Sequence, residues 1–188
     1  QFFEVERTIE CVDGSTYEVV VDVFGQNGTW EASDNTGTPG VTFTTNPSPL
    51  TLTNGTVNNP VVVGTVTATY PVNTAYNFSI NKISGPDPFF GETCDAIVTG
   101  DAPGLPACSI EGTDDVPCVG STTGAVYFTI TGGSPDQNGD YNYSITNDDT
   151  NQQVASGSSD GLIPAASVDL PAGSYTLTIT DDINCSQS

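Results

Sequence analysis

The sequence predicts an all-β protein made of two tandem β-sandwich repeats. Apolar and polar residues alternate in many short runs, and Pro, Gly, Asn and Asp separate these runs at intervals of about 8–12 residues, as in sandwich folds. A pattern that begins at Cys11 also begins again at Cys118. No segment sustains an apolar period of about 3.6 residues, so we expect very little helix.

The alternating runs define the expected strands. They cover residues 2–10, 17–24, 29–33, 41–45, 50–53, 61–70, 74–83 and 94–100 in the first repeat, and 125–131, 141–147, 153–156, 166–170 and 175–180 in the second. Trp30 is expected in the core of the first sandwich. Residues 101–117 are rich in proline, which predicts a short, stiff connector. We therefore place the boundary near residue 108, giving repeats 1–108 and 109–188.

The internal repeat is clearest at the cysteines. Residues 11–25 (CVDGSTYEVVVDVFG) and 118–132 (CVGSTTGAVYFTITG) both give a cysteine, a short Gly/Ser/Thr loop, an alternating strand and a glycine. The runs 75–81 (AYNFSIN) and 174–180 (SYTLTIT) lead to Cys94 and Cys185. Self-similarity of this kind indicates two copies of one structural unit.

The cysteines favour disulfides in an oxidising compartment, because no Cys-x-x-Cys pair and no histidine accompany them. The repeat suggests pairing Cys11 with Cys94 and Cys118 with Cys185. Cys108 is then unpaired, or bonded to another chain or to a segment outside this sequence. A Cys94–Cys108 pair, which would leave Cys11 over, is the alternative.

The charge excludes several classes of function. Asp and Glu number 23 against two basic residues, Arg7 and Lys82, for a formal charge of -21. Such a field repels nucleic acid and anionic lipid, and no apolar run is long enough to insert into a membrane. Without histidine, Ser-His and Cys-His catalysis are excluded, so we expect no enzyme activity. No signal peptide begins the sequence, so we expect a mature product or an excerpt.

Two candidate sites remain. Asp136, Asn138 and Asp140 carry side-chain oxygens at alternate positions, as at the start of a calcium loop. A plain turn between the strands at 125–131 and 141–147 is the competing interpretation. The acidic pairs at 114–115, 148–149 and 181–182 are similar candidates for calcium, and no other cofactor is expected. Phe89 and Phe90 form the one adjacent aromatic pair in a loop-like setting, a candidate binding platform.

The second repeat also resembles a known family. Its residues 117–133 (PCVGSTTGAVYFTITGG), 140–146 (DYNYSIT) and 170–185 (LPAGSYTLTITDDINC) resemble the SprB-type repeat of giant surface adhesins in gliding Bacteroidetes. The first repeat fits this pattern loosely. The resemblance implies immunoglobulin-like modules repeated many times in secreted, surface-anchored proteins used for adhesion or gliding.

These observations lead to three functional hypotheses. The first is a structural or adhesive repeat segment of a long secreted cell-surface protein, with neighbouring repeats and surface glycans as partners. The second is an extracellular filament assembled by β-strand exchange. In this hypothesis the second repeat lacks its last strand, and residues 2–10 are the donor strand. The alternative is that residues 2–10 are the opening strand of the first repeat itself. The third is a module that binds carbohydrate or another cell-surface partner.

Overall fold

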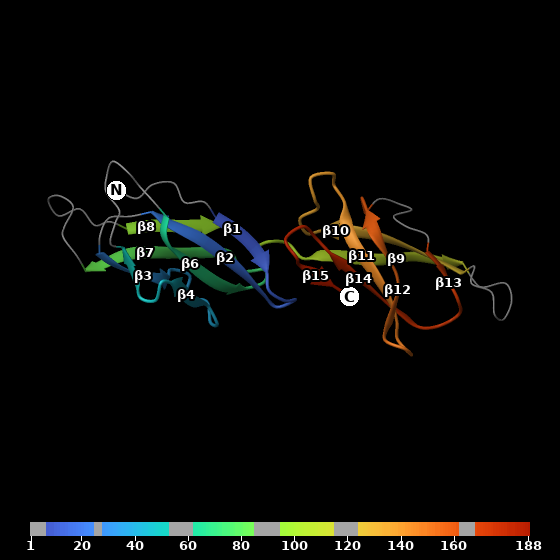
Figure 1. The fold of residues 1–188 in the computed structure, drawn as a ribbon. Helices are drawn as coiled ribbons and strands as arrows, with labels where there is room; N and C mark the ends of the chain where they lie inside the picture. The colour runs from blue at the N-terminus through green and yellow to red at the C-terminus, as the bar shows by residue number, and fades with distance from the viewer. Residues whose placement is uncertain (1–6, 25–27, 53–61, 85–94, 115–123, 162–167) are drawn as a thin grey trace. The chain divides into compact units, whose positions relative to one another are not determined.

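The computed structural model describes residues 7–24, 28–52, 62–84, 95–114, 124–161 and 168–188 (Figure 1). These residues form antiparallel sheets without a helix, which confirms the prediction of an all-β protein. Accordingly, none of them lies in a helix that could span a membrane. The chain divides into unit 1, Gln1–Ala102, and unit 2, Pro103–Ser188.

Unit 1 contains two four-stranded sheets, with strand orders β1-β2-β6-β4 and β5-β3-β7-β8. All neighbouring strands pair antiparallel. The strands are β1 (Arg7–Cys11), β2 (Thr16–Phe24), β3 (Gly28–Asp34), β4 (Thr42–Asn46), β5 (Leu50–Leu52), β6 (Val62–Pro71), β7 (Tyr76–Ser84) and β8 (Asp95–Gly100).

Aromatic side chains fill the space between the two sheets of unit 1. The rings of Tyr17 on β2 and Tyr70 on β6 stack with centroids 6.0 Å apart, and both lie within 6.5 Å of the Tyr76 ring on β7 in the other sheet. The Phe78 ring on β7 lies 6.4 Å from Tyr70 and 5.5 Å from Phe43 on β4. Each such ring pair adds about 0.5–1.5 kcal/mol to what burial alone provides. These contacts hold the sheets face to face, consistent with a β-sandwich.

Strand β7 shows why the sequence folds in this way. Tyr76, Phe78 and Ile80 are buried, and the residues between them are partly exposed. Because alternate side chains of a strand point to opposite faces, the apolar residues form the core face and the polar residues the outer face. Trp30 on β3 is 4 % exposed, which confirms its predicted place in the core.

Arg7 joins the edge strands of the two sheets in unit 1. Its Nη1 donates a hydrogen bond of 2.9 Å to the carbonyl oxygen of Thr99 on β8, and its guanidinium lies 5.7 Å from the Tyr76 ring centroid. A cation held over an aromatic face is attracted by the ring quadrupole. One of the two basic residues of the chain thus has a structural role.

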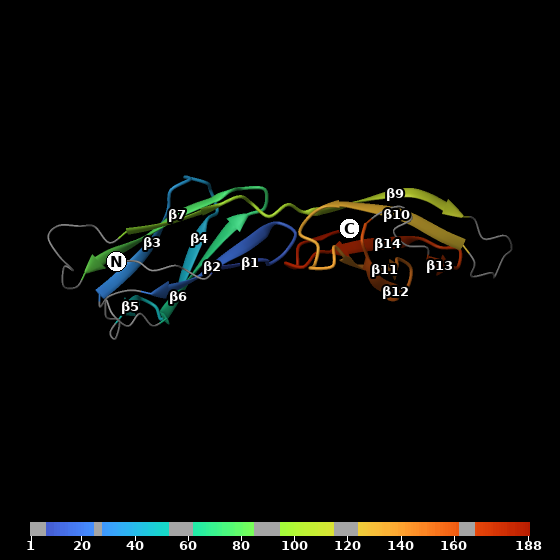
Figure 2. The same ribbon diagram turned by 90° about the horizontal axis from the view of Figure 1, so that it is seen from above.

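Unit 2 contains a three-stranded sheet, β13-β10-β9, and a four-stranded sheet, β12-β11-β14-β15. Figure 2 shows the same strands from above. Their bounds are β9 (Pro106–Asp114), β10 (Gly124–Gly132), β11 (Tyr141–Asn147), β12 (Gln152–Ser159), β13 (Val168–Leu170), β14 (Tyr175–Thr180) and β15 (Ser186–Gln187).

The core of unit 2 is smaller and is again shared by both sheets. Phe128 and Ile130 on β10 pack with Tyr141 on β11 and Ile179 on β14. The Phe128 ring meets Tyr143 edge to face at 5.4 Å. The hydroxyl of Tyr141 donates to the carbonyl oxygen of Gly132 at 2.7 Å, so this partly buried polar group keeps a partner.

The two units share one strand plan. In chain order, β1, β2, β3, β5, β6, β7 and β8 of unit 1 correspond to β9 through β15 of unit 2. The sheet β1-β2-β6 then matches β9-β10-β13, and β5-β3-β7-β8 matches β12-β11-β14-β15. Among the described strands, β4 alone has no counterpart.

Two expectations about segment boundaries differ from the structure. Residues 106–114, expected within the connector, form β9, which pairs with β10 over nearly its whole length. The division between units consequently falls at Ala102–Pro103, several residues before the expected position. At the other end, Ser186 and Gln187 form the short strand β15, which sequence analysis did not predict.

Candidate functional site

The cysteines fall into two chemical states. Cys11, 5 % exposed at the end of β1, and Cys185, fully buried, are both disulfide-bonded, whereas Cys108 on β9 is a free cysteine. A Cys94–Cys108 bond, the alternative pairing, is therefore wrong for this structure. Cys94 and Cys118 lie outside the described residues, so the Cys11–Cys94 and Cys118–Cys185 pairings remain predictions.

The candidate calcium residues form a turn. The Asp136 carboxylate accepts hydrogen bonds from the backbone amides of Asn138, at 2.8 Å, and Asp140, at 2.9 Å. The Asp136 amide donates to the Asp140 carbonyl oxygen, and Gly139 adopts a φ of 89°. These amide hydrogen bonds lower the pKa of Asp136. The geometry is that of the competing turn, and calcium binding here stays a prediction.

The other acidic pairs also have protein partners. Asp148 accepts a hydrogen bond from the Thr176 hydroxyl at 2.8 Å, and Asp114 accepts one from the Tyr127 hydroxyl at 2.7 Å. Within the described ranges, no group of three or more Asp, Glu, Cys or His side chains could hold a metal ion. Asp115, Phe89 and Phe90 lie outside those ranges.

Asp181 has a structural role that sequence analysis missed. It is 2 % exposed, and its Oδ1 accepts hydrogen bonds from the amides of Ile183, at 3.2 Å, and Cys185, at 2.8 Å. Its Oδ2 accepts one from the amide of Ser134 at 2.9 Å. One carboxylate therefore joins the β10–β11 loop to the turn that carries the disulfide-bonded Cys185.

Gly133 lets the backbone approach this carboxylate. Its φ is 65°, a left-handed conformation that side chains disfavour, and a Cβ there would lie 3.1 Å from Oδ2 of Asp181. The Gly-Gly of residues 132–133 and the Asp-x-x-x-Cys of residues 181–185 are both recognisable in the sequence. Only the structure shows that Asp181 holds these two segments together.

In unit 1 the Asp34 carboxylate likewise accepts several hydrogen bonds. Burial acts to raise the pKa of Asp34, but hydrogen bonds from Thr36, Tyr70 and Gly37 outweigh it, so this pKa lies below its usual value. Burial and the Asp34 carboxylate together raise the pKa of the Tyr70 hydroxyl, which donates to Asp34 at 2.9 Å.

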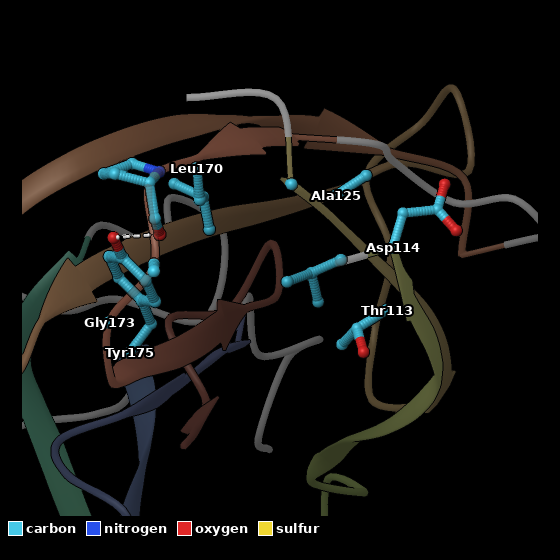
Figure 3. Close-up of a pocket in the computed structure, with 10 residues that line it drawn as sticks. Thr113, Asp114, Ala125, Leu170, Gly173 and Tyr175 are labelled. Carbon is cyan, nitrogen blue, oxygen red and sulfur yellow. Dashed lines mark hydrogen bonds between the residues drawn. The ribbon is translucent and has the colours of Figure 1, made fainter. Parts of the chain in front are cut away.

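An open groove of about 510 Å³ lies at one end of unit 2 (Figure 3). Its walls come from the end of β9 (Thr113, Asp114), the start of β10 and the segment from Leu170 to Tyr175. The hydroxyl of Tyr175 is already used, since it donates to the Pro171 carbonyl oxygen at 2.9 Å. The described lining also includes the Asp114 carboxylate and the Leu170 side chain.

No protein-family model matches the chain, and no curated protein matches it.

Peptide mapping under non-reducing conditions tests the cysteines. We expect Cys11 and Cys185 in disulfide-linked peptides and Cys108 alkylated without reduction. A peptide that joins Cys11 to Cys94 would support the repeat-based pairing. A peptide that joins Cys11 to Cys118 or Cys185 would contradict it.

Replacing Asp181 with Asn should destabilise unit 2 by about 1–3 kcal/mol, because a buried amide then faces the Ser134 amide and one acceptor is lost. Asp182→Asn is the matched control, since its side chain is exposed and the change should cost less than about 0.5 kcal/mol. Urea denaturation at neutral pH measures both. Equal effects of the two substitutions would contradict the role given to Asp181.

The Asp13 carboxyl should titrate near pH 2. Hydrogen bonds from the Ser15 hydroxyl, the Ser15 amide and the Thr16 amide lower its pKa from 3.8 to about 2. Because the folded pKa is depressed, its stabilising effect is complete above about pH 4 and is lost as the pH falls through 2. Carbonyl-detected NMR measures this titration. Ser15→Ala should move the midpoint back toward 3.8, and an unchanged midpoint in that variant would refute the assignment.

Proposed function

We propose that this chain is a non-enzymatic structural or adhesive segment of a long secreted cell-surface protein, built from immunoglobulin-like repeats of the SprB type. The observation that carries the proposal is the shared strand plan of the two units. Repetition of one closed unit suits an extended surface protein, because length is gained by adding modules.

The immunoglobulin-like assignment is supported by strand order. If β1, β2, β6 and β4 are lettered A, B, E and D, and β3, β7 and β8 are C, F and G, unit 1 has the ABED sheet of that fold and a CFG sheet to which β5 adds an edge strand. Trp30 then lies buried on strand C, as in antibody domains. The disulfides differ, since Cys11 ends strand A instead of lying on strand B.

Tyr175 in unit 2 also supports the immunoglobulin-like assignment. It begins β14, which corresponds to strand F, and its hydroxyl donates to the backbone carbonyl of Pro171, four residues upstream, at 2.9 Å. A tyrosine near the start of strand F that bonds upstream backbone is the tyrosine corner of immunoglobulin-like sandwiches.

The absence of enzyme activity is part of the proposal. The sequence contains no histidine, and Arg7 serves the fold of unit 1. The carboxylates of Asp13, Asp34, Asp136 and Asp181 accept hydrogen bonds within turns and loops. No pair of acids among the described residues is thereby singled out for general acid-base work.

The strand-exchange filament is the second candidate. It needs a strand donated by a neighbouring subunit to a sheet edge. Its expected donor, residues 2–10, is partly engaged elsewhere, because Arg7–Cys11 pairs with β2 in its own unit. The carbohydrate-binding alternative rests on Phe89 and Phe90, which lie outside the described residues.

Antibody labelling of the source cells tests the proposed function. Antibodies raised against the chain should stain intact cells as strongly as permeabilised ones, because the protein is displayed outside, and Fab fragments should reduce attachment to surfaces. An antibody against a cytoplasmic protein controls for leakage. Staining that requires permeabilisation would refute the surface assignment.

A further inference from the structure

The loop between β10 and β11 carries an asparagine followed directly by a glycine, Asn138-Gly139 (Figure 1). Such a pair can react without an enzyme. The backbone nitrogen of the glycine attacks the side-chain amide carbon of the asparagine, and glycine allows this approach because it has no side chain to hinder it. Asn138 is exposed, so water reaches the site.

The reaction has two steps. In the first, a bond forms between the Gly139 nitrogen and Cγ of Asn138, and the bond from Cγ to Nδ2 breaks. The amide proton of Gly139 leaves with Nδ2 as ammonia, and a succinimide ring remains. In the second step, water opens the ring and leaves aspartate or isoaspartate at position 138. The net change is hydrolysis of one amide, so no reagent other than water is consumed.

The native turn restrains the attacking nitrogen. The Gly139 amide donates a hydrogen bond of 2.9 Å to the carbonyl oxygen of Asp136, and this proton must be given up before the ring can form. The amides on either side, of Asn138 and Asp140, donate to Oδ1 of Asp136 at 2.8 Å and 2.9 Å. These bonds fix the backbone around the nitrogen and thereby oppose the attack.

The Asp136 carboxylate also contacts the group that would leave. Nδ2 of Asn138 donates to Oδ2 of Asp136 at 3.3 Å. Attack on Cγ places negative charge on the side-chain oxygen of Asn138, and a carboxylate at this distance disfavours added negative charge. The amide hydrogen bonds that lower the pKa of Asp136 keep this carboxylate ionised at neutral pH.

The neighbouring asparagines are less reactive by sequence. Asn142 and Asn147 are followed by Tyr143 and Asp148, whose side chains hinder the attack. The chain has two further Asn-Gly pairs, at residues 27–28 and 54–55, and both include residues outside the described ranges. Within those ranges, Asn138-Gly139 is the one complete pair of this kind.

We propose that Asn138 is a deamidation site that the Asp136 turn keeps unreactive in the folded chain. When the turn opens, the amide becomes open to attack. The product does not restore the turn, because a carboxylate at position 138 has no side-chain proton to donate to Asp136 and is repelled by it. The inference rests on this loop alone and goes beyond the proposed surface function, so either can fail without the other.

Incubation of the whole chain at mildly alkaline pH, followed by peptide mapping with mass spectrometry, measures the conversion of Asn138. We expect it to be about tenfold slower or more in the folded chain than in guanidinium chloride, because the folded chain must first break the hydrogen bonds of the turn. The Asn-Gly pairs at 27–28 and 54–55 should also convert in guanidinium chloride, which controls for the reaction conditions.

A substitution at Asp136 isolates the role of the turn. Asp136→Ala should raise the conversion of Asn138 in the folded chain about tenfold, because the acceptor of the amides and the nearby charge are both removed. Asp149→Ala is the matched control, since it removes the same charge from an exposed position between β11 and β12 and should leave the rate unchanged. Hydrogen exchange at the Tyr143 amide, within β11, shows whether unit 2 stays folded in each variant.

Three results would overturn the proposal. They are equal conversion in the folded and denatured chain, an unchanged rate in a folded Asp136→Ala chain, and an equal rise in the Asp149→Ala chain. If Asp136→Ala unfolds unit 2, Asp136→Asn takes its place, because it keeps one oxygen to accept from the amides but loses the charge. A smaller rise is then expected, and an unchanged rate again contradicts the role given to Asp136.

Discussion

The register that places aromatic side chains between facing sheets is the constraint on which the rest of each unit depends. In unit 1, Tyr17, Tyr70 and Phe78 are fully buried and contact one another or Tyr76 across the sandwich. A slip of one residue in any of these strands would turn its rings to solvent and bring its outward-facing residues to the core. Because this register is fixed, Arg7 is placed where it reaches Thr99.

Carboxylates fix several turns of this protein by accepting hydrogen bonds from backbone amides. With two basic residues against 23 acids, ion pairs cannot balance the charge. Asp13, Asp136 and Asp181 instead accept hydrogen bonds from backbone amides in tight turns, where several N–H groups converge. Hydrogen bonds to a charged acceptor are stronger than neutral ones. The acids thereby fix the loops as well as keeping the surface polar.

The sequence predicted most strands because their two faces differ. Alternation identified β7, β10 and β14, and the turn interpretation of residues 136–140 matches the hydrogen bonds found there. Strand β9 was missed because its residues after Pro106 are exposed or only partly buried. The sequence of this edge strand therefore shows no regular alternation of apolar and polar residues. Strand β15, two residues long, gives no pattern at all.

The candidate site was harder to predict than the fold, because it depends on pairings between distant segments. Nothing in the residues 181–185 alone shows that Asp181 accepts a hydrogen bond from Ser134, 47 positions away. Local composition does not encode this contact.

The contacts of Asp181 also couple a loop to a covalent bond. Its carboxylate accepts hydrogen bonds from the amides of Ser134 and Cys185, and Cys185 is disulfide-bonded. Movement of the β10–β11 loop away from this carboxylate would leave a buried charge with fewer donors, which is costly. The loop and the disulfide-bonded turn therefore open together.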